Sequence, residues 1–314
     1  MSKLAFIFPG QGSQTVGMGK DLFNEVEASR SVFAAADEKL GFKLTDIIFE
    51  GPQEKLTLTY NAQPALLTAS IAVLGKFKES GIQPDFVAGH SLGEYTALVA
   101  GGVLSFEDAV YAVRKRGEYM NEAVPAGVGA MAAILGMNTD DLREVTEQIT
   151  SDGFSVQLAN LNCPGQIVIS GSAEGVEKAS ALAKENGAKR AIPLDVSGPF
   201  HSELMKPAAD KFKGILDEVS LKDASVPVVA NVTAAPVTDS EDIKNLLVEQ
   251  LFSPVKWEQS VIEMIEQGVT TFVEIGPGKV LSGLVKKIDR KVNTIAVSDL
   301  ASIEAAIEKL REVK

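Results

Sequence analysis

The segment Gly89-His90-Ser91-Leu92-Gly93 constrains the fold more than any other part of the sequence. It fits the pattern G-x-S-x-G, follows a short apolar run at 85–88 and precedes a stretch with helical spacing at 92–100. A strand that turns into a helix within so few residues needs flanking glycines, because a Cβ there would collide with neighbouring backbone. The serine is then lifted to the carboxyl edge of a sheet, at a helix N-terminus whose dipole favours negative charge. This arrangement is typical of a serine nucleophile.

Patterns typical of strands and helices alternate along most of the 314 residues, which predicts an α/β fold with a mostly parallel sheet and helices on both faces. Short apolar runs predict buried strands at 4–8, 85–88, 228–230, 271–275 and 294–297. Apolar spacing of three and four predicts helices at 21–40, 64–78, 92–100 and 110–122, and others that begin near residues 203, 242, 258, 279 and 302.

The order of predicted strands and helices changes between residues 124 and 197. This stretch predicts a strand, a helix, two strands, a helix and a strand, at 129–135, 140–149, 155–159, 166–170, 173–185 and 189–194. A βαββαβ order is the ferredoxin-like pattern, and its ends lie close together, so it can be inserted into a larger domain. We therefore predict a large catalytic subdomain made of residues 1–123 and 198–314, and a small ferredoxin-like subdomain made of residues 124–197.

The overall charge and the cysteine content exclude several classes of protein. The formal net charge of -12 disfavours binding to the phosphate backbone of nucleic acids. Cys163 is the single cysteine, so an internal disulfide cannot form, and no Cys/His spacing typical of zinc is present. No apolar stretch approaches the roughly 20 residues that span a bilayer. We expect a cytoplasmic, monomeric protein that needs no metal or cofactor and contacts neither nucleic acid nor membrane.

A serine hydroxyl needs a base to become a nucleophile, and the chain contains two histidines. His90 adjoins the serine, and because neighbouring side chains in such a turn point in different directions, we expect His90 to pack under it. His201 follows the loop-type segment 197–200, where the insert rejoins the main domain, and clefts form at such junctions. His201 is therefore the candidate general base. Asp195, Glu203, or a backbone or amide oxygen could orient its imidazole.

A serine acyl-transfer site also requires two N–H donors that stabilise the oxyanion. The N–H of Leu92, directly after the serine, is the expected first donor. The loop Pro9-Gly10-Gln11-Gly12-Ser13-Gln14 follows the first strand and is the expected source of the second. The same loop could cradle a phosphate, although it lacks the Gly-Lys-Ser/Thr of a P-loop and the GxGxxG spacing. Arg116 lies in the helix at 110–122, where a lone arginine usually faces solvent.

A series of motifs, in order over nearly the whole chain, resembles the malonyl-CoA:acyl-carrier-protein transacylase family. The motifs are Phe8-Pro9-Gly10-Gln11-Gly12-Ser13-Gln14, Asn61-Ala62-Gln63-Pro64-Ala65, Gly89-His90-Ser91-Leu92-Gly93-Glu94, Arg116-Gly117, Asn160 with Pro164-Gly165-Gln166, Pro199-Phe200-His201-Ser202 and Glu274-Ile275-Gly276-Pro277-Gly278. The chain length is similar to that of the bacterial fatty-acid synthesis enzyme rather than to a domain of a multienzyme.

The resemblance implies an α/β-hydrolase-like core with a ferredoxin-like insert, and it implies a catalytic role for particular residues. Ser91 would be the nucleophile and His201 the base. A glutamine carbonyl orients the imidazole in this family, and Gln250 resembles that residue, which replaces the acidic candidates. Gln11 and Leu92 would supply the oxyanion N–H groups.

The resemblance also implies the substrate and its contacts. Arg116 would pair with the free carboxylate of a malonyl group, a task that suits the planar fork of a guanidinium. Gln63, Asn160 and Phe200 are expected to bind substrate, and Phe200 resembles the malonyl rather than the methylmalonyl type. The expected partners are malonyl-CoA and acyl carrier protein, in a ping-pong reaction that supplies fatty-acid synthesis.

Two other functions share parts of this pattern. A serine hydrolase would use water in place of a thiol, but Arg116 and the absence of a clear acid after the serine favour transfer to a protein thiol. A non-catalytic subunit that binds acyl carrier protein would have no need of both Ser91 and His201.

Overall fold

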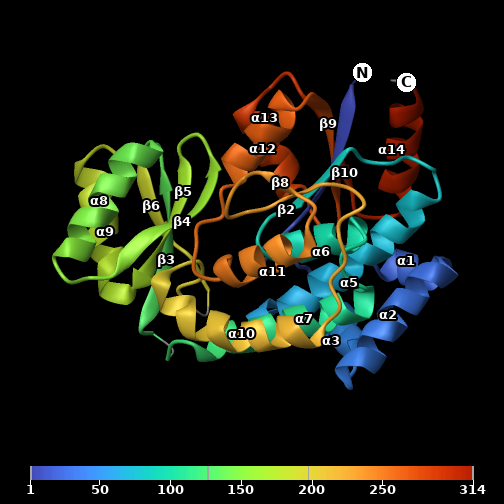
Figure 1. The fold of residues 1–314 in the computed structure, drawn as a ribbon, viewed down its shortest axis with the longest axis horizontal. Helices are drawn as coiled ribbons and strands as arrows, with labels where there is room; N and C mark the ends of the chain where they lie inside the picture. Colours follow the sequence, from blue (N-terminus) through green and yellow to red (C-terminus); the bar gives the residue numbers. More distant parts are fainter. Residues whose placement is uncertain (1, 126, 197, 313–314) are drawn as a thin grey trace.

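The described residues form two β-sheets, which the computed structural model shows as a large and a small unit (Figure 1). The structure describes residues 2–125, 127–196 and 198–312. In this part of the chain the large sheet has the strand order β10-β9-β1-β2-β7-β8, and every neighbouring pair is parallel except β7 and β8. The strands are β1 Lys3–Phe8, β2 Phe86–Gly89, β7 Val228–Val229, β8 Pro236–Val237, β9 Val269–Ile275 and β10 Asn293–Val297. The predicted α/β class with a mostly parallel sheet is confirmed.

Helices cover both faces of the large sheet because its strands alternate their side chains between two cores. Phe6 and Phe8 of β1 enter the core shared with α2, α5, α6, α7, α10 and α14, whereas Ala5 and Ile7 enter the core shared with α12 and α13. The helices of the large unit are α1 Lys20–Glu25, α2 Glu27–Leu40, α3 Leu44–Glu50, α4 Gln53–Thr57, α5 Thr59–Lys78, α6 Leu92–Ala100, α7 Phe106–Glu122, α10 Lys206–Glu218, α11 Ser240–Glu249, α12 Trp257–Glu266, α13 Val280–Ile288 and α14 Leu300–Glu312, with a 3-10 turn at Glu203–Met205.

The small sheet is antiparallel and has the strand order β4-β5-β3-β6, the order of a ferredoxin-like fold. Its elements are β3 Gly129–Leu135, α8 Thr139–Ser151, β4 Val156–Cys163, β5 Gln166–Ser172, α9 Ala173–Glu185 and β6 Arg190–Pro193. Two helices pack against this sheet around a core of their own (Figure 1). Residue 197, at which the predicted insert ends, lies outside the described residues.

The edge strand β4 ties the small sheet to the large unit. The N–H of Leu161 donates to the carbonyl of Val255, and the N–H of Val255 donates to the carbonyl of Ala159. Val255 lies in the segment between α11 and α12. Because β4 also carries Asn160 and Asn162, these backbone bonds place polar side chains of the insert next to the carboxyl edge of the large sheet.

The helix predicted at 21–40 is wrong in one respect, because it is broken. Val26 has an extended backbone (φ -118°, ψ 111°) and separates α1 from α2. The side chain of Arg30 donates to the carbonyls of Phe23 and Asn24 at the end of α1. Those carbonyls lose their helical partners at the break, so the arginine satisfies them. The short helices α3 and α4 were not predicted from the sequence.

Helix α5 begins at Thr59, five residues before the predicted start at Pro64. A proline within a helix cannot donate to the carbonyl four residues earlier. That carbonyl belongs to Tyr60, and it accepts a hydrogen bond from Nη1 of Arg114 on α7 at 2.9 Å. The tertiary contact therefore offsets the cost of Pro64, which no pattern within the segment indicates.

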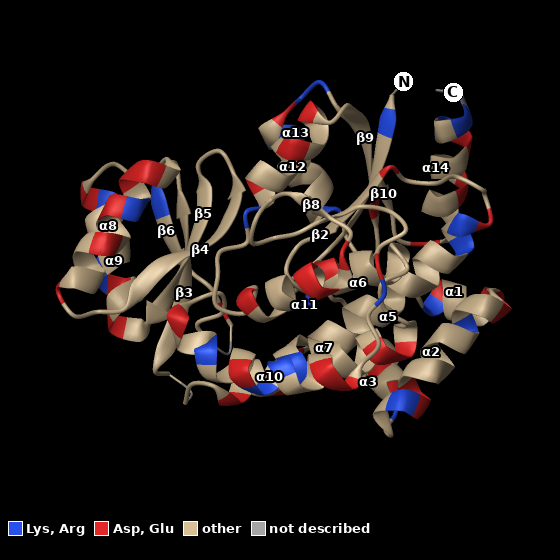
Figure 2. Ribbon diagram, in the orientation of Figure 1, with Lys and Arg blue, Asp and Glu red and all other residues tan. Residues whose placement is uncertain are grey.

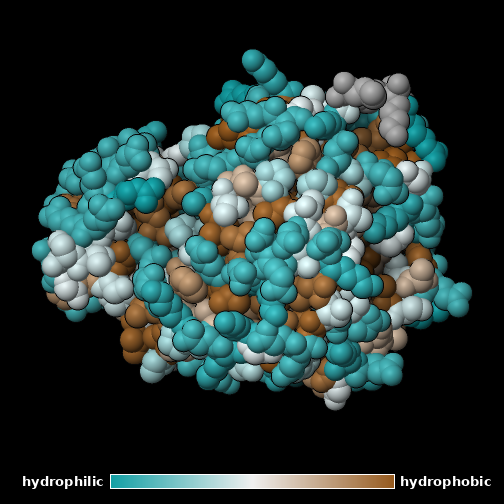
Figure 3. All heavy atoms as spheres, in the orientation of Figure 1, coloured by the Kyte–Doolittle hydropathy of each residue, from teal (hydrophilic) through white to brown (hydrophobic). Residues whose placement is uncertain are grey.

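The surface is mixed in character. Acidic residues are spread over the helices of both units (Figure 2). On the face in Figure 3, hydrophilic residues cover most of the helices of the insert, and hydrophobic residues are exposed near the middle of the molecule. Within the described ranges, no helix combines the length and the apolar composition needed to cross a membrane.

Candidate active site

Ser91 lies in a strained turn between β2 and α6. Its backbone has φ 51° and ψ -104°, a conformation that side chains rarely adopt. A Cβ on Gly89 would lie 1.9 Å from the carbonyl of Gly93, and a Cβ on Gly93 would lie 2.1 Å from the carbonyl oxygen of Phe8. The flanking glycines are therefore required by the close approach of α6 to the strands, as the sequence predicts.

Asn231, just after β7, holds the turn from the neighbouring strand. Its Oδ1 accepts from the N–H of Ser91 at 2.7 Å, and its Nδ2 donates to the carbonyl of Gly89 at 2.7 Å. The oxygen and the NH₂ group of one side-chain amide thus hold the backbone at the strained residue Ser91 and at Gly89, two residues earlier. Such over-determination allows a backbone in an unfavourable region to persist.

Ser91, His201 and Gln250 form a continuous hydrogen-bonded chain. Oγ of Ser91 lies 2.8 Å from Nε2 of His201, and Nδ1 of His201 lies 2.8 Å from the main-chain carbonyl oxygen of Gln250. A carbonyl oxygen can only accept, so Nδ1 carries the proton and Nε2 is free to accept the proton of the serine. The glutamine carbonyl that orients the imidazole is thus a backbone group.

Burial and a nearby cation keep His201 neutral. Only 3% of the residue is exposed. Burial, together with the positive charge of Arg116, lowers the pKa of His201 to about 3. The imidazole is therefore an unprotonated acceptor throughout the neutral pH range.

The other candidates for base and orienting acid lie elsewhere. Nε2 of His90 is hydrogen-bonded to Oδ1 of Asn162 at 2.8 Å, and its ring packs beside Trp257. Glu203 is exposed and pairs with Lys206. Asp195 lies at the pocket, but Nδ1 of the base is occupied by the backbone carbonyl.

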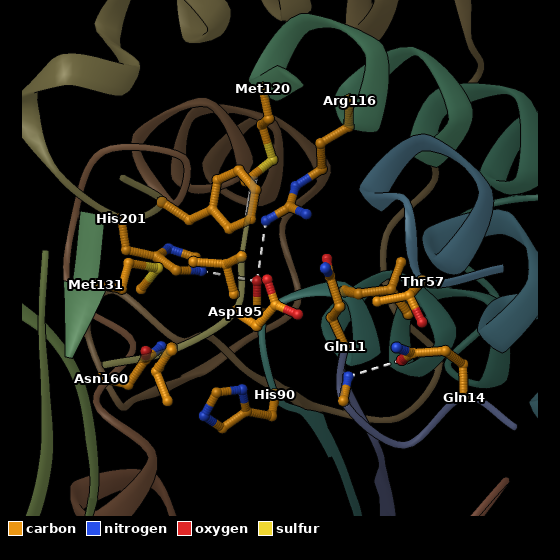
Figure 4. A pocket seen from close by; sticks show the side chains of 16 residues that line it. Gln11, Gln14, Thr57, His90, Arg116, Met120, Met131, Asn160, Asp195 and His201 are labelled. Carbon is orange, nitrogen blue, oxygen red and sulfur yellow. Dashed lines mark hydrogen bonds between the residues drawn. The ribbon is translucent and has the colours of Figure 1, made fainter. Parts of the chain in front are cut away.

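Arg116 is buried and reaches the nucleophile. Only 1% of the residue is exposed, in contrast to a lone arginine on a solvated helix face. Its Nη2 donates to Oγ of Ser91 at 3.0 Å and to Oε1 of Gln250 at 2.9 Å, and its Nη1 donates to Oε1 of Gln63 at 2.7 Å. The guanidinium and the imidazole thus contact one serine oxygen (Figure 4).

These groups open into a cavity of about 300 Å³ between the large unit and the insert. Its polar lining residues include Gln11, His90, Ser91, Arg116, Asn160 and His201. Its apolar lining residues include Leu194, Val196 and Phe200, together with Met120, which lies beside Arg116, and Met131, which lies beside His201 (Figure 4). The cavity is large enough for a short acyl group and the end of a thiol-bearing arm, and the cationic Arg116 lines it.

The residues predicted from the sequence differ in their relation to this cavity. Gln11, Leu92, Asn160 and Phe200 line it beside the serine. Leu92 begins α6, so its N–H has no acceptor within the helix. Gln63 is buried and does not line the cavity, because its amide bonds Arg116 on one side and Thr59 on the other.

Sequence reasoning missed three kinds of residue. Asn231 lies two residues after the end of β7, the strand beside the one that leads to the serine, and this position was its available signal. Glu94 directly follows the segment Gly89–Gly93, but nothing in its spacing shows that its side chain is buried. Met120 and Met131 line the cavity and have no chemical signature in the sequence.

The chain is similar to known proteins over nearly its whole length. Residues 5–304 match the family model described as "Acyl transferase domain". The chain is 69% identical over 312 residues to the malonyl CoA-acyl carrier protein transacylase of Bacillus subtilis strain 168, covering 99% of this chain and 98% of the relative. It is 49% identical over 304 residues to the protein of the same name from Staphylococcus aureus strain MSSA476, covering 97% and 98%.

Solved structures are also similar to this chain. An acyl carrier protein S-malonyltransferase from Vibrio cholerae superposes with a TM-score of 0.95 at 46% identity, covering 97% of this chain and 100% of the other. A malonyl-transacylase in complex with a type II PKS acyl-carrier protein superposes with a TM-score of 0.95 at 44% identity, covering 98% and 100%. The matches span both units of the fold, so the chain belongs to the acyl transferase family and, within it, to the malonyl CoA-acyl carrier protein transacylases.

Proposed function

We propose that the protein transfers a malonyl group from malonyl-CoA to the phosphopantetheine thiol of acyl carrier protein, through an ester on Ser91, and so supplies fatty-acid synthesis. One observation carries the proposal: Oγ of Ser91 lies 2.8 Å from the base His201 and 3.0 Å from the buried guanidinium of Arg116. A nucleophile that contacts both a base and a cation is suited to an acyl group that bears its own carboxylate.

In the first half-reaction, Nε2 of His201 takes the proton of Ser91 while Oγ attacks the thioester carbonyl. The backbone N–H groups of Gln11 and Leu92 receive the oxyanion. The tetrahedral intermediate collapses, the C–S bond breaks, and the imidazolium returns its proton to the leaving thiolate of CoA. In the second half-reaction the thiol of the carrier protein attacks the ester by the same steps in reverse.

Arg116 is placed to bind the malonyl carboxylate. In a malonyl ester the carboxylate is separated from the ester carbonyl by one CH₂, so it lies close to the esterified oxygen. Nη2 of Arg116 is 3.0 Å from that oxygen in the free protein. Gln63 and Gln250 hold the two terminal nitrogens of the guanidinium, and we propose that Gln63 acts through this contact rather than by touching substrate.

The proposal includes the division of the chain into residues 1–123 with 198–314 and residues 124–197. The separate cores of the two sheets support it, and the cavity lies where they meet. Met131, Asn160 and Leu194 approach from the insert, and Ser91 and Arg116 approach from the large unit. A cytoplasmic site of action is part of the proposal, as the resemblance to the bacterial fatty-acid synthesis enzyme implies.

The proposed function is tested by comparing how fast the malonyl group is transferred to the carrier thiol with how fast it is hydrolysed by water. Purified protein is incubated with labelled malonyl-CoA, with and without phosphopantetheinylated acyl carrier protein, and malonyl-carrier and free malonate are measured. We expect transfer to the carrier to exceed malonate release by at least about a hundredfold, since catalysis positions the thiol. Malonate release that is equally fast with and without carrier would identify a hydrolase, and no turnover at all would identify a non-catalytic subunit.

Two basic clusters flank the turn between β4 and β5 and are the proposed docking surface for the acidic carrier. The stem of Lys189 packs on Gly136, whose N–H donates to the carbonyl of Gly165 in that turn. On the other side, Nζ of Lys287 donates to Oε1 of Gln166 at 3.0 Å. Basic residues at the start of β6 and beyond the end of α13 are visible in Figure 2. The clusters consist of Lys189 and Arg190, and of Lys286, Lys287 and Arg290.

We expect the double variant Lys189→Glu/Lys287→Glu to raise KM for the carrier protein by about 3- to 30-fold, since exposed pairs contribute up to about 1 kcal/mol each. KM for malonyl-CoA should stay unchanged. Lys287 is preferred over Lys286, whose Nζ bonds the carbonyl of Val292 at 2.5 Å. The exposed Lys309 on α14 provides the matched control, Lys309→Glu. Equal effects on the two substrates would exclude this surface.

A further inference from the structure

Glu94 is a buried carboxyl group behind the nucleophile. It lies in the first turn of α6, and only 3% of the residue is exposed. Its Oε2 accepts from Nε2 of Gln250 at 2.6 Å and from the N–H of Asn231 at 3.2 Å. Neither Ser91 nor His201 contacts this carboxyl, so the steps described above leave it without a role.

The side-chain amide of Gln250 connects Glu94 to Arg116. Nε2 of this amide donates to Glu94, and its Oε1 accepts from Nη2 of Arg116 at 2.9 Å. A carboxylate can only accept, so it selects the NH₂ end of the amide. The oxygen end is then directed at the guanidinium. In the reversed orientation the amide would place its NH₂ against the guanidinium and its oxygen against the carboxylate.

The guanidinium of Arg116 has neutral hydrogen-bond partners. They are Gln63, Ser91 and Gln250. Among the described residues, none of the ion pairs within 4.0 Å includes Arg116. A buried cation without a nearby anion is costly. Glu94, one amide away, supplies the negative charge that stabilises it before substrate binds.

We propose that Glu94 is a positioning residue, whose carboxylate fixes the side-chain amide of Gln250 and thereby holds Arg116 ready for the malonyl carboxylate. The inference rests on the proposed function. It assigns Glu94 to recognition of the acyl group rather than to the proton transfers at Ser91. Loss of the carboxylate should therefore reduce malonyl transfer more than acetyl transfer.

The charge of Glu94 depends on pH in the neutral range. Burial raises the pKa of Glu94 to about 7, although the hydrogen bonds from Gln250 and Asn231 and the charge of Arg116 oppose the shift. The titratable groups that face this carboxyl are Arg116 from α7 and Tyr95 from α6 itself, and burial raises the pKa of Tyr95 as well, so the phenol is neutral. Gln250 and Asn231, from the end of α11 and the segment after β7, are uncharged.

The direction of the pH effect follows from the raised pKa. Above about pH 7 the carboxylate is ionised and accepts from Gln250; as the pH falls through this value it takes up a proton and can also donate. The Nε2 group of Gln250 then loses its charged acceptor and keeps the weaker one, the main-chain carbonyl of Ser91 at 3.1 Å, so the orientation of the amide is held less firmly. His201 stays neutral there because its pKa is about 3, so the same pH change leaves the base unprotonated.

The wild-type enzyme provides the first test. We would measure kcat/KM for malonyl-CoA and for acetyl-CoA from about pH 5 to about pH 9 and plot their ratio. The ionisations of CoA and of His201 affect both substrates and cancel. We expect the ratio to fall by about tenfold as the pH drops through about 7, the effect of one hydrogen bond to a charged group. A ratio that is flat through this range overturns the proposal.

Glu94→Gln provides the second test, because it removes the charge and keeps the shape. At about pH 8 we expect the malonyl-to-acetyl ratio to be about tenfold below wild type and independent of pH, with acetyl transfer changed little. Asn231→Ala is the control, since it removes the two 2.7 Å bonds that hold the turn at Ser91 and only a long contact of 3.4 Å to the amide of Gln250, so it should reduce kcat/KM for both substrates about equally. An unchanged ratio in a folded Glu94→Gln protein overturns the inference. Absence of malonyl transfer in the wild type would instead refute the proposed function.

Discussion

Replacing His201 by alanine is expected to lower kcat for malonyl transfer by about three to six orders of magnitude while leaving the fold intact. The imidazole is the group that accepts the serine proton, at 2.8 Å from Oγ of Ser91, and Gln250 fixes it in the required tautomer. No other neutral base contacts that oxygen within the described part of the chain. Single-turnover formation of the malonyl ester, measured by rapid quench, reports the step directly.

His90→Ala is the matched control for that loss. His90 lines the cavity, but its Nε2 is bonded to Asn162 and its ring packs beside Trp257. We expect a lower melting temperature and a change in the acylation rate of at most about tenfold, since truncating a buried, hydrogen-bonded ring costs stability. If folded His90→Ala were the more damaging variant, the assignment of the base would be wrong.

Replacing Arg116 by alanine should change which acyl group the enzyme prefers. Removing one partner of a buried charged pair costs roughly 2–5 kcal/mol, so kcat/KM for malonyl-CoA is expected to fall by about 30- to several-thousand-fold. Acetyl transfer should fall little or rise, because acetyl leaves the wild-type guanidinium buried without a carboxylate. Arg116→Lys should recover only part of the malonyl activity, since an ammonium cannot make two parallel hydrogen bonds.

The ratio of kcat/KM for the two thioesters is the quantity to compare. Arg114, on the same helix, is hydrogen-bonded to Glu118 and to the carbonyl of Tyr60, away from the serine. Arg114→Ala should therefore lower stability and keep the ratio. An unchanged ratio of kcat/KM for malonyl-CoA to that for acetyl-CoA in Arg116→Ala would mean that another group binds the malonyl carboxylate.

Features that depend on a short stretch of neighbouring residues could be predicted from the sequence. The turn at Gly89–Gly93 requires glycines on both sides of the serine, and the structure places Ser91 between β2 and α6 as expected. The local patterns of the insert predict the order βαββαβ along the chain. This order is typical of a ferredoxin-like fold, and the observed sheet has that arrangement. His201 could be found because the chain offers only two histidines.

Features that depend on tertiary contacts could not be predicted. The continuation of α5 across Pro64 depends on Arg114, which is 50 residues away in sequence. Gln250 orients the base through a main-chain carbonyl, which every residue has, so residue type alone carried no signal and only the resemblance indicated it. The role proposed for Glu94 depends on an amide 156 residues away in sequence.

The central claim is that the malonyl group passes through an ester on one serine. The protein is mixed with malonyl-CoA, quenched in acid and digested, and the modified peptide is identified by mass spectrometry. The account predicts one malonyl adduct, on Ser91, that disappears when acyl carrier protein is added before the quench and is absent from Ser91→Ala. A malonyl group on another residue, or transfer to the carrier by Ser91→Ala at the wild-type rate, would contradict it.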